Sequence, residues 1–97
     1  MIAQEILNQL GGNRFIIMTG ARAFLGHQDG LSFAIPRAKN GINRIMIKLN
    51  GKDLYDVTFS KFNRAKLTNV MVSSVSDVYC ESLRDVFTEA TGLYTSL

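Results

Sequence analysis

The stretch that decides the fold is RIMIKLNGKDLYDVTF, which runs from Arg44 to Phe59. Apolar and polar residues alternate on both sides of Asn50-Gly51, and this pattern is typical of two strands joined by a turn. The apolar residues of both strands share one face only if the loop between them has an odd length, and a two-residue Asn-Gly turn would expose one apolar set. We therefore predict a hairpin with a three- or five-residue loop that contains a glycine bulge, and with Arg44 or Met46 opposite Asp56 on the outer face.

The segments before this hairpin predict one helix and two strands. Apolar residues recur at helical spacing from Ile2 to Leu10, and two glycines follow where a helix can end. RFIIM, residues 14–18, is short and bounded by glycines, so we predict a buried strand. LSFAI, residues 31–35, alternates large apolar with small side chains and is predicted as a strand that ends at Pro36. The glycine-rich segment between these two strands predicts a loop with at most a short strand around Phe24.

The segment after the hairpin predicts a strand and then a helix. LTNVMVSSV, residues 67–75, is rich in β-branched residues and is predicted as a further strand. Apolar residues then recur at helical spacing from Val75 to Ala90, which predicts an amphipathic helix of about four turns. Ser74 and Asp77 resemble a capping box at the start of this helix, and Gly92 suits a left-handed cap at its end.

These segments predict an α+β fold in a single domain, residues 1–97. An N-terminal helix precedes a mainly antiparallel sheet of four to five strands, and the C-terminal amphipathic helix packs on one sheet face. RAKNGIN, residues 37–43, is expected to be an exposed basic connection. The strand that ends at Pro36 is expected to lie at a sheet edge, through which a homodimer could form. The predicted core consists of Phe33, Ile45, Ile47, Val57, Phe59, Leu83 and Phe87.

The composition indicates a small globular protein. Of its 97 residues 46% are hydrophobic and 20% are charged, which suffices for one core. No segment approaches the roughly 20 apolar residues that a membrane-spanning helix needs, and MIAQEILNQL lacks the basic start of an export signal. The single cysteine, Cys80, cannot form an internal disulfide, so we expect a reducing cytoplasm and a small core residue at this position.

Charge is unevenly distributed along the chain. From Arg37 to Lys66, eight Lys and Arg residues stand against Asp53 and Asp56, whereas from residue 67 onward Arg84 is the only cation beside four acidic residues. The basic segment could attract a polyanion, or it could be a solvated face that the acidic part of the same domain attracts. Phe62 is expected to be mostly buried. The candidate macromolecule-binding residues are Arg37, Lys39, Arg44, Lys61, Phe62, Arg64 and Lys66.

The polar residues give little support for catalysis. One His and one Cys cannot build a closed zinc site, so neither a metal nor another cofactor is expected. His27 and Asp29 are close enough in sequence to form an acid–base pair, but a solvated turn is the simpler role for this segment. MTGARAFLG lacks the Gly-Lys-Ser/Thr spacing of a phosphate loop, so Gly20 is expected to permit a turn rather than to bind an anion. We therefore predict no catalytic residues.

Three segments resemble one family of phage proteins. GGNRFIIMTGA, NGINRIMIKLNGKDLYDVTF and VFTEATGLYT are similar to sequences of an uncharacterised family of short proteins from tailed phages and prophages. The resemblance covers nearly the whole chain. It implies a phage origin and favours small binding proteins such as host-system inhibitors, nucleic-acid accessories and virion or assembly factors, but it implies no particular site residues.

Together these observations predict a non-enzymatic phage accessory protein in the cytoplasm of the host cell. We expect it to act by binding another macromolecule, and the first hypothesis is a protein partner such as a host or virion component. The alternative is nucleic-acid binding through the basic region of residues 37–66, in which case its cations would contact phosphates.

Overall fold

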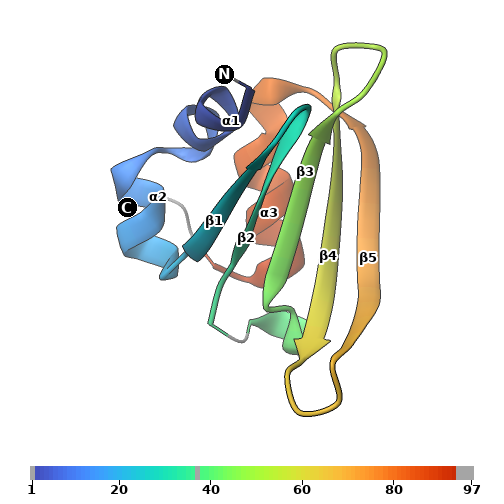
Figure 1. Ribbon diagram of the computed structural model, residues 1–97. Coiled ribbons are helices and arrows are strands. Elements are labelled where there is room, and N and C mark those ends of the chain that lie inside the picture. Colours follow the sequence, from blue (N-terminus) through green and yellow to red (C-terminus); the bar gives the residue numbers. More distant parts are fainter. Residues whose placement is uncertain (1, 37, 94–97) are drawn as a thin grey trace.

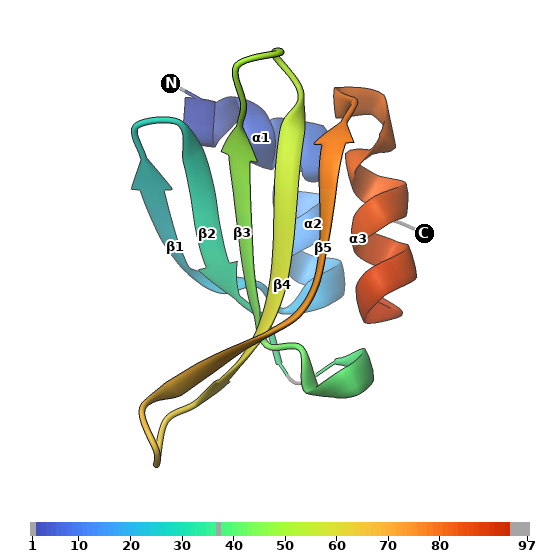
Figure 2. The same cartoon turned by 90° about the vertical axis from the view of Figure 1, so that its right-hand side faces the viewer.

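The structure is a computed structural model that describes residues 2–36 and 38–93. Within these residues five strands form one antiparallel sheet in the order β1-β2-β3-β4-β5. The helices lie on one side of the sheet and leave its other face open (Figure 1, Figure 2). The predicted α+β fold is confirmed. The elements are α1 (Ile2–Leu10), α2 (Asn13–Thr19), β1 (Arg22–His27), β2 (Gly30–Ala34), η1 (Lys39–Gly41), β3 (Arg44–Leu49), β4 (Tyr55–Asn63), β5 (Thr68–Val78), η2 (Cys80–Ser82) and α3 (Leu83–Thr91).

Three phenylalanines from different elements form the centre of the core between the sheet and the helices. The ring of Phe15 in α2 lies 5.5 Å from that of Phe33 in β2 and 5.1 Å from that of Phe87 in α3, edge to face in both cases. Such pairs contribute about 0.5–1.5 kcal/mol beyond the burial of the rings. The predicted core is confirmed, because all of its members are buried: Phe33, Ile45, Ile47, Val57, Phe59, Leu83 and Phe87.

The central hairpin has the predicted odd-length loop. Ile45 in β3 pairs with Phe59 in β4, and both side chains are fully buried under the helices. The loop has five residues, 50–54, which is one of the two expected lengths. Asp53, and not a glycine, adopts the left-handed conformation in this loop, with φ of 59°. The predicted glycine bulge is therefore wrong, and a short polar side chain takes that place because it tolerates this conformation better than most residues.

The register of the hairpin differs from the prediction on the outer face. Lys48, rather than Arg44 or Met46, lies opposite Asp56. The reason is that the loop is centred on its third residue instead of on the Asn-Gly dipeptide. The Asn50 side-chain oxygen accepts hydrogen bonds from the backbone N–H groups two and four residues later, at 2.8 and 3.2 Å, and so organises the whole loop.

RFIIM is helical, so the predicted strand is wrong. This segment belongs to α2, which starts after Gly12 and ends at Gly20 with a left-handed cap (φ 72°). Phe15 and Thr19, one helical turn apart, are buried, whereas Ile17 between them is 81% exposed. The burial therefore follows a helical period, although the apolar composition resembles that of a buried strand.

The C-terminal helix begins later than predicted. β5 continues to Val78, and the 3₁₀ turn η2 separates it from α3, which begins at Leu83. The predicted capping box of Ser74 and Asp77 is therefore wrong, because both residues lie in a strand. Asp77 adopts a φ of 57° and donates its backbone N–H to Asp56 Oδ1 at 3.1 Å. This bond helps to hold the chain on the sheet at the place where the sequence pattern suggests a helix.

The apolar stripe predicted for this helix is only partly buried before Leu83, where Val78 at the end of β5 is 4% exposed. Val75 and Tyr79 are 39% and 60% exposed, because they lie on the edge strand and just after it. Cys80 is exposed in η2, so the expectation of a core cysteine is wrong. From Leu83 onward the stripe faces the core, and Gly92 ends α3 with the predicted left-handed cap (φ 76°).

The strand that ends at Pro36 lies inside the sheet, so the predicted edge is wrong. β2 pairs with β1 on one side and with β3 on the other. A Cβ atom at Gly30 would collide with the backbone of Ile47, so only glycine permits this close approach of β2 to β3. The partner strand β1 occupies the glycine-rich segment, where the sequence predicts at most a short strand.

The basic connection between β2 and β3 is less exposed than predicted. It contains the short turn η1, and the Ile42 side chain that follows is only 1% exposed. The backbone of Asn43 continues the ladder, since its carbonyl accepts the Ile35 N–H at 2.9 Å and its N–H donates to Ser60 at 3.1 Å. Among residues 2–36 and 38–93, no helix has the length and apolar character needed to cross a membrane.

Candidate macromolecule-binding site

The far end of the β4–β5 hairpin projects from the sheet. Figure 2 shows that it continues beyond the other strands and bends away from the helices. We call residues 61–71 the arm. Every residue from Asn63 to Met71 is exposed, and a four-residue turn at 64–67 joins the two strands. The Asn63 side-chain oxygen accepts a hydrogen bond from the Lys66 backbone N–H at 3.1 Å and so supports this turn.

Large apolar side chains of the arm are open to solvent. Leu67 is 78% exposed, Val70 is 59% exposed and Met71 is 62% exposed. Val70 and Met71 belong to the eleven-residue strand β5, which pairs with β4 and has no second neighbour in the described part of the chain. The outer edge of β5 therefore presents free backbone N–H and C=O groups beside apolar side chains.

Three of the predicted binding residues come together at the base of the arm. Arg44, Phe62 and Arg64 line one hollow on the open face of the sheet, with a volume of about 270 Å³. We call it the arginine hollow. Phe62 is half-buried there, whereas the sequence predicts that it is mostly buried. The complete lining of the hollow is Arg22, Ala34, Ile35, Asn43, Arg44, Phe62 and Arg64.

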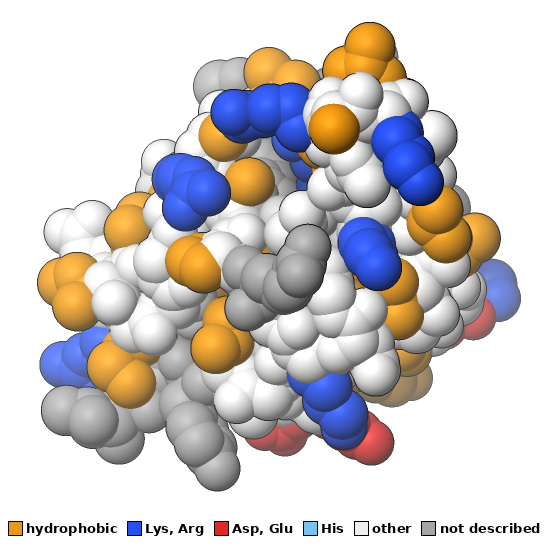
Figure 3. Space-filling view, turned by 90° about the horizontal axis from the view of Figure 1, so that it is seen from below, with side chains coloured by type: hydrophobic (Ala, Val, Ile, Leu, Met, Phe, Trp, Pro, Cys, Tyr) orange, Lys and Arg blue, Asp and Glu red, His pale blue; other side chains and the backbone are white. Residues whose placement is uncertain are grey.

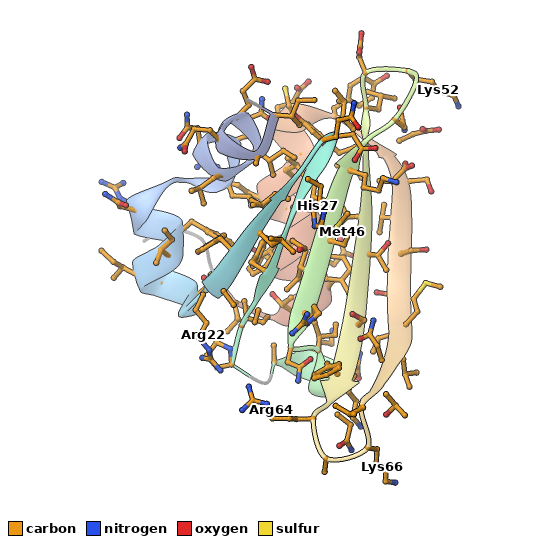
Figure 4. All side chains as sticks on the ribbon, viewed as in Figure 1. Arg22, His27, Met46, Lys52, Arg64 and Lys66 are labelled. Atoms are coloured by element: carbon orange, nitrogen blue, oxygen red, sulfur yellow. The ribbon has the colours of Figure 1, made fainter. Side chains whose placement is uncertain are left out.

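The remaining predicted residues lie outside this hollow. Lys39 lies in η1, and the aliphatic part of Lys61 lies against the neighbouring Gly41. Lys66 is at the turn of the arm and points away from the hollow (Figure 4). Arg37 falls outside the described residues. Three of the predicted residues thus line the hollow, and the other described ones are exposed cations outside it: Lys39, Lys61 and Lys66.

The sheet register explains how the hollow forms. Arg22, Ala34 and Arg44 pair side by side across β1, β2 and β3, on the face that the helices leave open. Because adjacent strands lie about 4.8 Å apart, the Cα atoms of the two arginines are about 10 Å apart. The methyl group of Ala34 between them leaves a depression. Figure 4 shows Arg64 reaching toward Arg22 from the arm.

Phe62 and Asn43 hold one wall of the hollow in place. The guanidinium carbon of Arg44 lies 4.9 Å from the centre of the Phe62 ring, which is cation–π geometry. The Asn43 side chain accepts the Phe62 N–H at 2.8 Å and donates to the Phe62 carbonyl at 3.0 Å. This pair of hydrogen bonds fixes the Phe62 backbone, and through the ring it orients Arg44.

The two ends of the sheet differ in how their charges are paired. The ion pairs within the described residues are Lys48 with Asp29 at 3.6 Å and Lys52 with Asp77 at 3.1 Å. Figure 4 places Lys52 at the end opposite Arg22 and Arg64. The view toward the arm end in Figure 3 shows Lys and Arg side chains among hydrophobic ones, with acidic side chains only at the margin. The arm end therefore carries a positive field.

The loop residues considered for catalysis have structural contacts. His27 Nε2 is 2.9 Å from Ser32 Oγ, and Asp29 pairs with Lys48. His27 is half-buried at the end of β1 instead of fully solvated. Gly20 forms the cap of α2, which is the turn role expected of it.

Cys80 has a neighbour that weakens its nucleophilicity. Its thiol donates a hydrogen bond to Glu81 Oε2 at 3.2 Å, and this bond raises the pKa of Cys80. A thiol with a raised pKa is less ionised near neutral pH. Within the ranges that the structure describes, no cluster of three or more His, Cys, Asp or Glu side chains is placed to hold a metal ion.

Of the four lining residues that the sequence prediction misses, two are polar: Arg22 and Asn43. Arg22 could have been found from Asp29-Gly30, since this dipeptide before the LSFAI strand is a hairpin signal that predicts a partner strand upstream. Its place opposite Ala34 could not, because β1 has an irregular register after Arg22. Asn43 gives no signal in sequence, since its partner is 19 positions away.

Comparisons of this chain with protein-family models, with curated proteins and with solved structures gave no significant match. The features of the structure that bear on function are therefore the exposed surface of the arm and the geometry of the arginine hollow.

Proposed function

We propose that this chain is a non-enzymatic accessory protein of phage type that binds another protein through β5 and the arm. The observation that carries the proposal is the long open edge of β5 with its exposed apolar side chains. The occupant that fits this edge is an extended segment of a partner protein that adds a strand beside β5. Main-chain hydrogen bonds would give such a complex its affinity.

The sequence of β5 lacks the lysine and proline that commonly protect an edge strand. Natural edge strands are commonly short, or carry lysine, proline or inward-pointing charge, and these features prevent unwanted pairing. β5 has eleven residues, and Asp77 is its only charged member. Register irregularities lie on both sides of Ser73–Val75, so the regular outermost stretch is Thr68–Met71. This stretch is where a partner strand would pair.

The chemistry of the arm favours an acidic partner segment with apolar residues. Lys61, Arg64 and Lys66 lie in the same arm as the exposed side chains of Val70 and Met71, and Lys61 pairs directly with Val70 in the sheet. Alternating acidic and apolar residues on the added strand would complement both the cations and the apolar side chains. The net charge of +3 also favours approach of an acidic partner.

Leu67 at the turn of the arm supports a contact role. It adopts φ of 52° and is 78% exposed. The left-handed conformation costs a residue with a side chain roughly 1–2 kcal/mol, and glycine would avoid this cost. A leucine with a strained backbone and an exposed side chain makes no evident contribution to the stability of the fold. Contact of its side chain with a partner would explain why leucine occupies this position.

A pair of matched substitutions tests the proposal. Val70 on β5 and Leu25 on β1 are each 59% exposed and lie on opposite edge strands. A photo-crosslinking amino acid at position 70 would capture the partner from host lysate, and the identified partner would then be purified. We expect Val70→Lys to weaken its affinity at least about tenfold and Leu25→Lys to leave it unchanged. Equal effects of the two substitutions, or none from Val70→Lys, would contradict the proposal.

The same samples distinguish a second copy of the chain from another protein. Sedimentation of the wild type at high concentration reports self-association through β5, and Val70→Lys would abolish it. If the wild type self-associates through β5, partner binding should compete with self-association. Partner binding without such competition would contradict the proposal that the partner binds at this edge.

Nucleic-acid binding is a second candidate, favoured by the positive field at the arm end. Its distinguishing property is salt dependence, because each phosphate contact releases counterions. Under the protein-binding proposal we expect DNA affinity no better than about 10⁻⁴ M at physiological salt, the ordinary non-specific range. A DNA affinity a hundredfold tighter would favour nucleic-acid binding instead. In that case the triple variant Lys61→Ala/Arg64→Ala/Lys66→Ala should reduce the slope of log affinity against log salt by up to about three units.

A further inference from the structure

We propose that the arginine hollow is a binding site for a phosphate oxyanion. This inference does not depend on the protein-binding proposal, because the hollow includes Arg22 from β1, the edge strand opposite β5. It assigns a ligand class to three arginines that have no carboxylate partner among the described residues.

The first support is convergence of cations from three separate elements. Arg22 comes from β1, Arg44 from β3 and Arg64 from the turn of the arm, and all three line the same hollow. The hollow is about 270 Å³, several times the roughly 30 Å³ that one water occupies in the liquid. A depression of this volume is large enough to hold a tetrahedral oxyanion.

The second support is the lack of a carboxylate partner for these cations inside the described structure. Neither Arg22, Arg44 nor Arg64 has a carboxylate within 4.0 Å among residues 2–36 and 38–93. Three guanidinium groups that line one depression repel each other, and an anion bound between them would offset this repulsion. A phosphate suits this arrangement better than a single carboxylate, because it carries more oxygens and, as a monoester, more charge.

The third support is that one of the three arginines is held in a fixed orientation. The Arg44 guanidinium stacks on Phe62 at 4.9 Å, and Asn43 fixes the Phe62 backbone with two hydrogen bonds. Stacking leaves the in-plane N–H groups of a guanidinium free to form the paired hydrogen bonds that phosphate accepts. A side chain that is already ordered loses less entropy when the ligand binds.

A nuclear magnetic resonance titration tests the inference. Inorganic phosphate would be added to the intact chain at constant ionic strength, with chloride as the reference anion. We expect saturable shifts of the arginine side-chain N–H signals and of the backbone amides of Asn43 and Phe62. Shifts that stay linear in phosphate, or that chloride reproduces, would overturn the inference.

Substitutions distinguish a site from general attraction to a basic surface. Arg22→Gln should weaken phosphate binding at least about tenfold, since a hydrogen-bonded charge is lost. Arg14→Gln is the matched control, because Arg14 is an exposed arginine on α2 outside the hollow. Equal weakening in both variants would overturn the inference. Arg22→Lys should restore part of the affinity, and the unfolding midpoint would confirm that each variant is folded.

A second titration identifies the source of the phosphate. Short oligothymidylate supplies phosphodiesters, whereas inorganic phosphate models a small phosphorylated molecule. If oligothymidylate binds at least about tenfold more tightly than inorganic phosphate, and Arg22→Gln removes this difference in affinity, the natural ligand of the hollow is the nucleic-acid backbone. Equal affinities would assign the hollow to a small phosphate, and both results support an oxyanion site. Loss of partner binding in Val70→Lys with intact phosphate binding would separate this site from the protein-binding edge.

Discussion

The β4–β5 hairpin has two halves that differ in what their residues contact. In the half near the loop 50–54, one face of the hairpin lies under the helices, and Phe59 is fully buried. In the arm the same two strands project from the sheet (Figure 2), every residue from Asn63 to Met71 is exposed, and Phe62 is half-buried on the open face. One continuous pair of strands thus serves first as part of the core and then as an exposed surface.

Polar side chains show the same contrast. Near the loop, Asn50 donates to Asp56 at 3.0 Å and to Asp77 at 2.9 Å, and Lys52 pairs with Asp77 at 3.1 Å. These groups satisfy one another and connect the loop to β5. In the arm, by comparison, the cations face solvent. The polar groups at the loop end therefore pair with one another, whereas the cations of the arm stay exposed.

The largest expected effect separates the two phenylalanines. Phe59→Ala should cost about 3–5 kcal/mol of unfolding free energy, because it opens a cavity in the core. Phe62→Ala should cost no more than about 1 kcal/mol, mainly the lost contact with Arg44. Urea denaturation of both variants measures the difference. Equal losses would mean that the arm is packed as tightly as the core and would remove the contrast.

A smaller effect separates two asparagines at the opposite ends. Asn50→Ala should cost about 2 kcal/mol, since it removes several hydrogen bonds around the loop. Asn63→Ala removes one bond in an exposed turn and should cost no more than about 0.5 kcal/mol. Thermal unfolding of the two variants gives the comparison. A larger loss for Asn63→Ala would show that the arm turn, and not the loop, stabilises the hairpin.

The sequence predicts the β3–β4 hairpin around the loop 50–54 far better than it predicts the ends of neighbouring elements. Strict alternation in residues 44–59, combined with the requirement that both apolar sets share a face, is sufficient to predict the odd loop and the core residues. The alternation no longer predicts the strand correctly beyond Val75. The irregular backbone at Asp77 changes the spacing of the apolar residues there, and this spacing also matches a helix. RFIIM fails for a related reason, since an apolar run of five residues does not reveal its period.

The candidate site is only partly predictable for a geometric reason. Arg44, Phe62 and Arg64 are found from sequence because they lie in or beside one hairpin. The predicted register nevertheless places Arg44 or Met46 opposite Asp56, whereas the structure pairs Arg44 with Ser60. Arg22 joins them only through the pairing of β1 with β2, and Ala23, with φ of 57°, breaks the regular pattern directly after it. No local pattern encodes such an irregular register, so the third cation of the hollow becomes visible only in the structure.

The smallest expected effect is a pH dependence that arises at the loop end. The Asp77 backbone N–H donates to Asp56 at 3.1 Å and Asn50 donates at 3.0 Å, and these bonds lower the pKa of Asp56 below the value of about 3.9 for an unperturbed Asp. Between the two pKa values the unfolded chain binds more protons than the folded protein. The resulting stabilisation is therefore complete above the unfolded pKa and is lost as pH falls through the folded pKa. We expect the unfolding free energy, measured in urea from roughly pH 6 to pH 2, to fall less steeply in Asp56→Asn than in the wild type. Asn50→Ala, which keeps the carboxylate but removes one donor, should give an intermediate slope, and a slope unchanged in both variants would show that the polar contacts at the loop end do not stabilise the charged carboxylate.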